Sequence, residues 1–425
     1  MSLKTIKLTL LFLALVAVVY AWPLTVISGS KIAYVIMGGL LVVFAVATAR
    51  KSGSVGLYTY IAAIGGAGFL HLGILGQSQY FWLSMASYLV IPLICGRYVL
   101  TPEQFDRLLL VFSIVAIPNL VGLATQSFGY RSELLVDEFT MTASEVHVRY
   151  TSFVGGALAL GMISTITALS SAYWLFARKQ YRLYNGLIFI ASIICLYFSF
   201  SRRGYVILAL GLLVLSWGIY KAQKRGISML FVASLLIGST VLVGATLGDL
   251  GTVFSRVWST TDFIDDPSNV LRVIKWIEAF NTIAEHPLLG IGFGASGTLG
   301  RDPSEFMNLP MADIFTAESY YLQVAMEGGV FVGAIVLLVI GHVIFGSLKM
   351  VRHDRKTLLT TTILVCLAFE SIAGTALTSP LSAIVFWLAF GINSSYFRMH
   401  TWYVRERMMH DKVLPLTNGS NHSWV

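Results

Sequence analysis

Residues 330–346 read VFVGAIVLLVIGHVIFG, without a lysine, arginine or acidic side chain. They belong to a longer apolar run over 319–346. An α-helix rises about 1.5 Å per residue, so about 20 residues cross the hydrocarbon core of a bilayer. This stretch therefore predicts a membrane-spanning helix.

Similar runs recur along the whole chain. We expect twelve spans, at about 8–22, 32–48, 55–75, 80–96, 108–125, 151–176, 184–200, 204–220, 227–246, 319–346, 357–377 and 380–397. Of the 425 residues, 56% are hydrophobic and 12% are charged, about half the charged share of a soluble domain. This composition excludes a soluble enzyme, a disordered chain and a disulfide scaffold, and the continuous runs exclude an outer-membrane barrel. The sequence predicts an all-α, polytopic transmembrane bundle, with residues 1–425 as one integral membrane domain.

The lysines and arginines set the orientation, because the cytoplasmic loops of membrane proteins are basic. With both termini in the cytoplasm, 20 of the 29 basic residues fall in cytoplasmic segments and nine fall outside. The net charge of +8 therefore reflects topology, and we expect no nucleic-acid partner. Residues 1–21 also resemble a signal peptide, and their cleavage is an open alternative that leaves the other spans in the same orientation.

Two outside loops are long, and long loops are commonly functional. The first covers 126–150, and the second, between spans nine and ten, covers 247–318. In the second loop, an initial proline and apolar residues at helical spacing predict an amphipathic helix over about 267–285. Its apolar face is expected on the membrane or on the bundle, with Arg272 and Lys275 on the other side. Lys275 is expected to be a solvated charge.

The turn Ser201-Arg202-Arg203-Gly204, between spans seven and eight, places two arginines on the outer face. Snorkelling at the membrane interface is one explanation. Basic residues avoid the outside, however, and the planar guanidinium group suits phosphate. We therefore expect this pair, together with Arg272, to bind an anionic ligand.

Glycines alternate directly after the amphipathic helix, at Gly290, Gly292 and Gly294. Glycine lets a backbone approach a ligand closely, so we expect this loop to lie near the ligand. A helix precedes these glycines and no Lys-Ser/Thr pair follows them, which excludes a P-loop. His71, within the third span, is expected to make an interhelical contact.

Three carboxylates are candidates for proton transfer or packing. Glu318 begins span ten, where the helix dipole stabilises its charge and where it would face the large loop as a general base. Glu327 and Glu370 fall inside apolar runs, where a carboxylate serves either function or helix packing. The aspartates of segment 262–266 lack a partner histidine, so we expect no metal site.

In this order, the motifs resemble those of the O-antigen ligase and O-antigen polymerase superfamily of bacterial membrane glycosyltransferases. The matching segments cover about 149–329 and are Arg149-Tyr-Thr-Ser-Phe, Ser201-Arg202-Arg203-Gly204, Arg272 with His286-Pro-Leu-Leu-Gly-Ile-Gly, and Glu318-Ser-Tyr-Tyr-Leu-Gln with Glu327-Gly-Gly. Each segment is short, but their order, spacing and common outer-face placement are specific together.

The resemblance implies a fold like that of the GT-C glycosyltransferases and a site on the periplasmic face of the bacterial inner membrane. It implies an oligosaccharide donor on undecaprenyl pyrophosphate. A sugar hydroxyl of the acceptor would attack the anomeric carbon of the donor, and the lipid pyrophosphate would leave. No metal or other cofactor is implied. Arg149, Arg202, Arg203 and Arg272 would bind the pyrophosphate, with Arg272 and Glu318 as catalytic residues, and the doubled arginine leaves open which of Arg202 and Arg203 is functional.

One departure from the family concerns the reaction. Ligases of the family carry a histidine where Glu318 stands here, and Glu318 can replace it only if burial raises its pKa. The missing histidine favours a polymerase that joins lipid-linked repeat units, with a chain-length regulator as an expected partner besides the donor, the acceptor and the bilayer. A ligase acting on lipid A core, another carrier-lipid sugar transferase and a transporter of lipid-linked sugars are the alternatives. Against the transporter, the chain shows no internal repeat.

Overall fold

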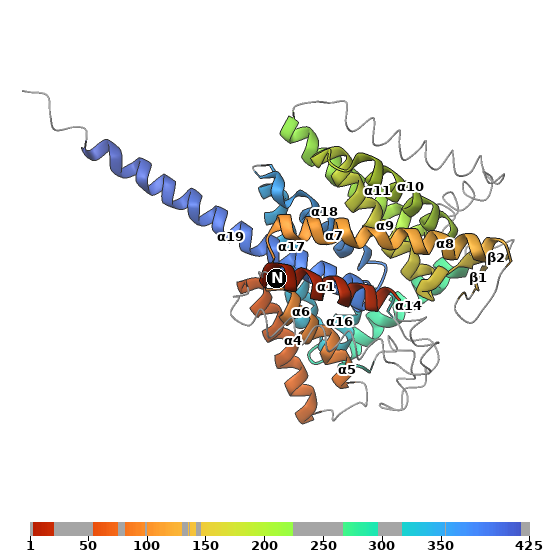
Figure 1. The fold of residues 1–425 in the computed structure, drawn as a ribbon. Coiled ribbons are helices and arrows are strands. Elements are labelled where there is room, and N and C mark those ends of the chain that lie inside the picture. Colours follow the sequence, from red (N-terminus) through yellow and green to blue (C-terminus); the bar gives the residue numbers. More distant parts are fainter. Residues whose placement is uncertain are drawn as a thin grey trace, which may run out of the picture.

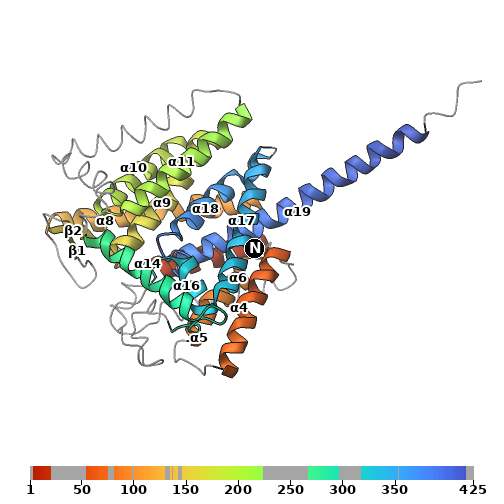
Figure 2. The same cartoon turned by 180° about the vertical axis from the view of Figure 1, so that it is seen from behind.

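A computed structural model of the chain describes residues 3–20, 54–74, 81–97, 100–129, 135, 137–141, 146–223, 267–295, 317–352 and 354–417 (Figures 1 and 2). These residues are mostly helical. The expected spans at 32–48 and 227–246 lie outside the described residues, as does most of the loop 247–318.

The described helices follow the apolar runs of the sequence. Their bounds are α1 Leu3–Val19, α4 Val55–Ile74, α5 Phe81–Met85, α6 Ile91–Cys95, α7 Pro102–Phe112, α8 Ala116–Ser127, α9 Ala157–Ala172, α10 Arg182–Phe198, α11 Arg202–Gln223, α14 Pro267–Glu285, α16 Tyr320–Gly328, α17 Val330–Val351, α18 Leu358–Glu370 and α19 Pro380–Thr417. Short π- or 3-10 segments continue or join some of them, at Ala86–Val90, Ser113–Val115 and Tyr173–Arg178.

Several helices are candidates for membrane spans by length and composition. Five stretches are long and apolar enough to cross a membrane: Pro102–Ser127, Ala157–Arg178, Arg202–Tyr220, Val330–Val351 and Pro380–Met399. Three shorter apolar helices accompany them, Thr5–Val19, Val55–His71 and Arg182–Phe198. Together they support a multi-pass membrane protein. The number of twelve spans stays a prediction, because two of the expected runs lie outside the described residues.

The run 319–346 is not one continuous helix, in contrast to the sequence prediction. α16 ends at Gly328, Gly329 has a φ of +87°, and α17 then begins at Val330. Only glycine adopts such a backbone conformation readily. A Cβ added at Gly329 would also lie 2.2 Å from the carbonyl oxygen of Leu288, so the loop after α14 fills the break. The long apolar helix of this region is therefore α17 alone.

The glycine-rich loop after α14 docks onto this break through its backbone. The Ile291 N–H donates to the Met326 carbonyl at 2.9 Å, and the Gly292 N–H donates to the Glu327 carbonyl at 3.0 Å. In return, the Val330 N–H donates to the Pro287 carbonyl at 2.9 Å. These bonds satisfy carbonyl groups that the end of α16 leaves without helical partners.

The close approach of the loop to the end of α16 explains why glycines occupy the loop. Gly290, Gly292 and Gly294 all have positive φ values, and a Cβ at Gly290 would lie 2.4 Å from the Met326 carbonyl oxygen. The expected approach of these three glycines to a ligand stays a prediction.

The expected outside loop 126–150 contains a β-hairpin, which the all-α prediction missed. β1 (Asp137–Met141) pairs antiparallel with β2 (Val146–Tyr150), with Asp137 opposite Tyr150 and Met141 opposite Val146. In β2, Val146, Val148 and Tyr150 alternate with polar residues, the period of a strand. A search for long apolar runs does not detect such a short alternating segment.

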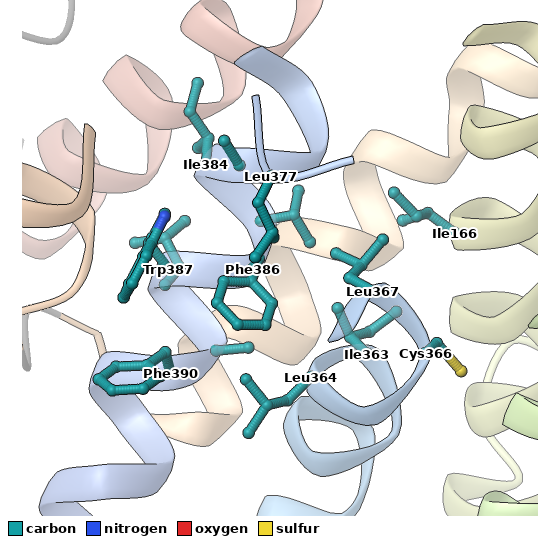
Figure 3. Close-up of a cluster of buried hydrophobic side chains, with 14 of the residues drawn as sticks. Ile166, Ile363, Leu364, Cys366, Leu367, Leu377, Ile384, Phe386, Trp387 and Phe390 are labelled. Atoms are coloured by element: carbon teal, nitrogen blue, oxygen red, sulfur yellow. The ribbon is translucent and has the colours of Figure 1, made fainter. Parts of the chain in front are cut away.

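Part of the core lies where α18 packs against α19 and against α9 (Figure 3). Phe386, Trp387 and Phe390 of α19 are buried, and the Trp387 ring lies 5.2 Å from the Phe386 ring and 5.0 Å from the Phe390 ring. Because lipid is as apolar as these side chains, close packing rather than the hydrophobic effect accounts for their contribution inside a bilayer. The C-terminal part of α19 runs out of the bundle (Figure 1).

Charged residues lie at both ends of the bundle, and Lys349, Arg355 and Lys356 gather at the end where α17 leads into α18. At one end, which we call the basic end, Lys356 pairs with Glu103 at 3.4 Å and Arg178 pairs with Asp106 at 3.0 Å. α9 and α11 run from there to the opposite end, where the β-hairpin, the α10–α11 turn, α14 and the start of α16 gather (Figures 1 and 2). We call this second end the site end.

We expect Gly290→Ala and Gly329→Ala each to lower the melting temperature of the full-length protein in detergent by several degrees. A side chain at either position meets backbone at a positive φ, which costs about 1–3 kcal/mol. Gly341→Ala in α17 is the matched control, because a Cβ there meets open space. Equal melting temperatures for the three variants and the wild type would contradict the docking role of the two glycines.

Candidate active site

The α10–α11 turn presents the doubled arginine at the site end. Ser201 caps α11, since its Oγ accepts the Gly204 N–H at 3.2 Å. A residue larger than glycine at position 204 would require the Leu196 side chain to shift, because a Cβ there would lie 2.5 Å from it. Arg202 and Arg203 therefore occupy the first turn of α11.

Arg203 is held by a buried carboxylate. A cation is disfavoured at a helix N-terminus, whose dipole is positive. Arg203 offsets this cost with two hydrogen bonds from Nη1, to Glu370 Oε1 at 3.2 Å and to the Ala373 carbonyl at 2.9 Å. The second Glu370 oxygen accepts the Ala376 N–H at 3.0 Å, and the Glu370 side chain is only 6% exposed. Glu370 thus fastens the chain after α18 to the start of α11.

The second part of the site lies on α14. Arg272 Nε donates to Glu318 Oε2 and Lys275 Nζ donates to Glu318 Oε1, both at 2.9 Å. The two cations are three residues apart on the helix, so one carboxylate bridges them. The Lys275 side chain is 11% exposed. The expectation of a solvated Lys275 was wrong, because helix spacing alone does not show that Glu318, far along the chain, meets this face of α14.

The backbone around Glu318 fixes the position of its carboxylate. Glu318 itself has a φ of +43°, a left-handed conformation that is uncommon for a residue with a side chain. The next residues are pinned: Ser319 Oγ accepts the Leu322 N–H at 3.4 Å as the N-cap of α16, and the Tyr320 N–H donates to the Ser371 and Gly374 carbonyls. Contacts of the residues that follow Glu318 thus hold it in a backbone conformation that is unfavourable by itself.

Both parts belong to one charge cluster, which we define as Arg203, Arg272, Lys275, Glu318 and Glu370. Arg203 lies within Coulombic range of Arg272 and of both carboxylates. Three cations and two carboxylates leave a formal charge of +1 (3 − 2). The members come from α11, α14, the segment before α16 and the end of α18, so the fold gathers them from distant parts of the sequence. Such a cluster attracts anions.

The other predicted arginines lie at the same end of the bundle. Arg149 of β2 donates from Nε to the Ser199 carbonyl at 3.1 Å, which ties the hairpin to the α10–α11 turn. Arg202 begins α11. Of the doubled arginine, Arg203 is the one that the structure places in the charge cluster. Binding of pyrophosphate by Arg149 and Arg202 stays a prediction.

Glu327 lies in a different, fully buried polar group. Gln323 Nε2 donates to Glu327 Oε1 at 3.2 Å, and the buried Tyr88 hydroxyl lies near this carboxylate. His71 contacts the carbonyl of Leu289 in the glycine-rich loop, so its contact is from helix to loop and not between helices. These interior groups support the docking of the loop.

The charge cluster keeps Glu318 ionised. Burial raises the pKa of its carboxyl, but the hydrogen bonds and charges of Lys275 and Arg272 outweigh burial and hold the pKa below its ordinary value. A raised pKa, the condition for Glu318 to replace a histidine, is therefore not met while both cations are bound. A carboxylate engaged in this way is a weak proton acceptor.

We expect kcat/KM of the wild-type enzyme to show no acid limb between about pH 5.5 and 8. Because the folded-state pKa of Glu318 is lowered, its charge and its ion pairs are lost only as the pH falls through that lowered value. Transfer rates measured at low substrate concentration across this range provide the test, with circular dichroism at each pH as the control for unfolding. An acid limb of kcat/KM near pH 6.5 would contradict the lowered pKa of Glu318.

Comparison with known proteins finds a similarity over this region. Residues 187–338 match the family model described as O-antigen ligase, and no curated protein matches the chain. The matched range contains the doubled arginine, Arg272, Lys275 and Glu318, whereas Arg149 and Glu370 lie outside it. Over residues 187–338 the chain is similar to the O-antigen ligase family, which supports the resemblance to the O-antigen polymerase and ligase superfamily.

Proposed function

We propose that this protein is a membrane glycosyltransferase that joins oligosaccharide repeat units carried on undecaprenyl pyrophosphate into a surface polysaccharide. The observation that carries the proposal is the charge cluster. It brings Arg203, Arg272 and Lys275 together at one end of the bundle, within the range that matches the family. The site end faces the periplasm of the inner membrane in this proposal, and the basic end and both termini face the cytoplasm.

The cations suit the leaving group of this reaction. The oxygen of the acceptor hydroxyl forms a bond to the anomeric carbon of the donor, and the bond from that carbon to the pyrophosphate oxygen breaks. The lipid pyrophosphate leaves with the electron pair, and the hydroxyl proton passes to a base. Negative charge therefore builds on the pyrophosphate, where Arg203 and Arg272 stabilise it with fixed, permanently charged guanidinium groups. In this proposal Arg272 and Glu318 are the catalytic residues, and Arg149 and Arg202 extend the pyrophosphate site.

Glu318 favours a polymerase over a ligase. A histidine in this place would take a proton near neutral pH, whereas the structure holds an ionised carboxylate between two cations. A chain-length regulator is then an expected partner. The matched family is itself described as O-antigen ligase, which supports transfer of polymer to lipid A core as the second candidate.

Transport of a lipid-linked sugar is less well supported. Substrate sites of transporters lie near the bilayer midplane, at the interface of repeats. Among the described residues, the ion pairs that link distant segments lie at the two ends of the bundle, Arg203–Glu370 and Arg272–Glu318 at one and Arg178–Asp106 at the other.

Deletion of the gene in the source bacterium distinguishes these reactions. We expect a gel of its surface polysaccharide to show lipid A core carrying a single repeat unit, because polymerisation is lost while ligation continues. Bare core with polymer accumulating on undecaprenyl pyrophosphate would instead identify the ligase. An unchanged ladder would contradict both assignments to O-antigen.

We expect Arg272→Ala to reduce transfer by at least about 100-fold, the cost of removing one stabilising group from a transition state. Polymer formed by the variant in the deletion strain measures the loss, with membrane insertion and expression checked by detergent extraction. Lys356→Ala is the control, because this lysine forms its ion pair with Glu103 at the basic end. Near-normal polymer from a correctly inserted Arg272→Ala protein would remove the pyrophosphate role of Arg272.

A further inference from the structure

Glu318 occupies the cations that the proposed donor needs. Both of its oxygens are bound, Oε2 by Arg272 and Oε1 by Lys275, at 2.9 Å each. A phosphate group offers the same kind of acceptor oxygens, and a guanidinium group binds carboxylate and phosphate with the same geometry. The carboxylate and a pyrophosphate therefore compete for one subsite.

The two cations keep their positions without Glu318, because α14 has its own packing. Ala279 of α14 is fully buried in a small cluster with Ile291, Ala317 and Met326. This cluster joins α14 to the glycine-rich loop and to α16, which lies beside it (Figure 2). Arg272 and Lys275 thus project from a fixed helix face, and the subsite is preorganised for an anion.

Of the two carboxylates in the charge cluster, Glu318 is the one that exchanges readily. Its side chain is 30% exposed, and within the described part of the chain its carboxylate is bound by the side chains of Arg272 and Lys275. Glu370 is buried, and its oxygens bind Arg203 and the Ala376 N–H, so its release would leave an uncompensated charge in the interior. A partly exposed ion pair costs far less to break.

The backbone at Glu318 also favours a change of state. Its left-handed φ of +43° is a strained conformation for a residue with a side chain. Strain at a functional position is commonly part of a two-state element.

We infer that Glu318 is an internal placeholder for the donor pyrophosphate, and that Lys275 is a further pyrophosphate-binding residue. This inference rests on the proposed function. In the free enzyme, Glu318 neutralises Arg272 and Lys275. The donor pyrophosphate displaces it from both cations.

Displacement couples donor binding to catalysis. Once released, Glu318 loses the two cations that lower its pKa and stands beside a pyrophosphate of like charge, so its basicity rises. It then accepts the proton of the acceptor hydroxyl as the hydroxyl oxygen bonds to the anomeric carbon and the pyrophosphate leaves. Glu318 can act as a base only when a donor occupies the site, so the acceptor hydroxyl is not deprotonated in the absence of a donor.

Binding of inorganic pyrophosphate to the full-length protein in detergent, measured by isothermal titration calorimetry, tests this inference. We expect Glu318→Gln to tighten binding by about five-fold or more, the scale of one partly exposed ion pair, and Lys275→Gln to weaken it by a similar factor. The gain from Glu318→Gln should shrink in the Lys275→Gln background, because one of the contested cations is gone. Glu103→Gln, which breaks the ion pair at the basic end, is the matched control and should leave binding unchanged.

The outcomes separate the placeholder from the proposed function. Wild-type binding that Glu318→Gln leaves unchanged or weakens would overturn the placeholder and retain the donor site. Absence of wild-type binding would overturn the pyrophosphate donor, and the placeholder with it. If Glu318→Gln fails to fold, Glu318→Asp keeps the charge on a shorter side chain that reaches the cations less well, and we then expect tightening of about two-fold. Weaker binding by Glu318→Asp would contradict the placeholder as well.

Discussion

Three backbone hydrogen bonds tie the chain at 287–292 to the break between α16 and α17, and the geometry of the site depends on them. The chain just before this contact is α14, which carries Arg272 and Lys275. The helix that ends at the break is α16, and Glu318 lies directly before it. Docking the loop onto the break therefore sets α14 beside the start of α16, so that two cations meet one carboxylate. The glycines at 290 and 329 are the residues that permit this close contact.

The carboxylates of the charge cluster compensate its cations when no ligand is bound, and two of these cations remain able to bind a ligand. Glu370 offsets Arg203 from inside the bundle and also holds the chain after α18, so this pair is part of the architecture. Glu318 offsets Arg272 and Lys275 from the exposed side, so this pair is open to exchange. A site that stored three uncompensated cations at a helix N-terminus and on one helix face would be strained by repulsion. The fixed carboxylate of Glu370 and the exchangeable carboxylate of Glu318 reduce this repulsion, and the second also leaves two cations available to a ligand.

Much of the helical layout was predictable, because an apolar run long enough to span a bilayer has few other stable conformations. The described α14 coincides with the expected range 267–285, where a proline suits the first turn and His286-Pro287 ends the helix. The break at Gly329 was not predicted, since the run continues through it and only the docked loop explains it. The β-hairpin was missed because its strands are short. Placing Arg203 in the charge cluster required its long-range contact with Glu370, and recognising Lys275 required the long-range contact with Glu318.

A structure of the full-length protein with undecaprenyl pyrophosphate in lipid nanodiscs is the most direct test of the charge cluster as a pyrophosphate site. We expect both phosphates to lie at the site end, in contact with Arg203, Arg272 and Lys275, and the Glu318 carboxylate to have left Arg272 and Lys275. Phosphates bound at the basic end, or bound at the site end with Glu318 still bridging Arg272 and Lys275, would contradict it.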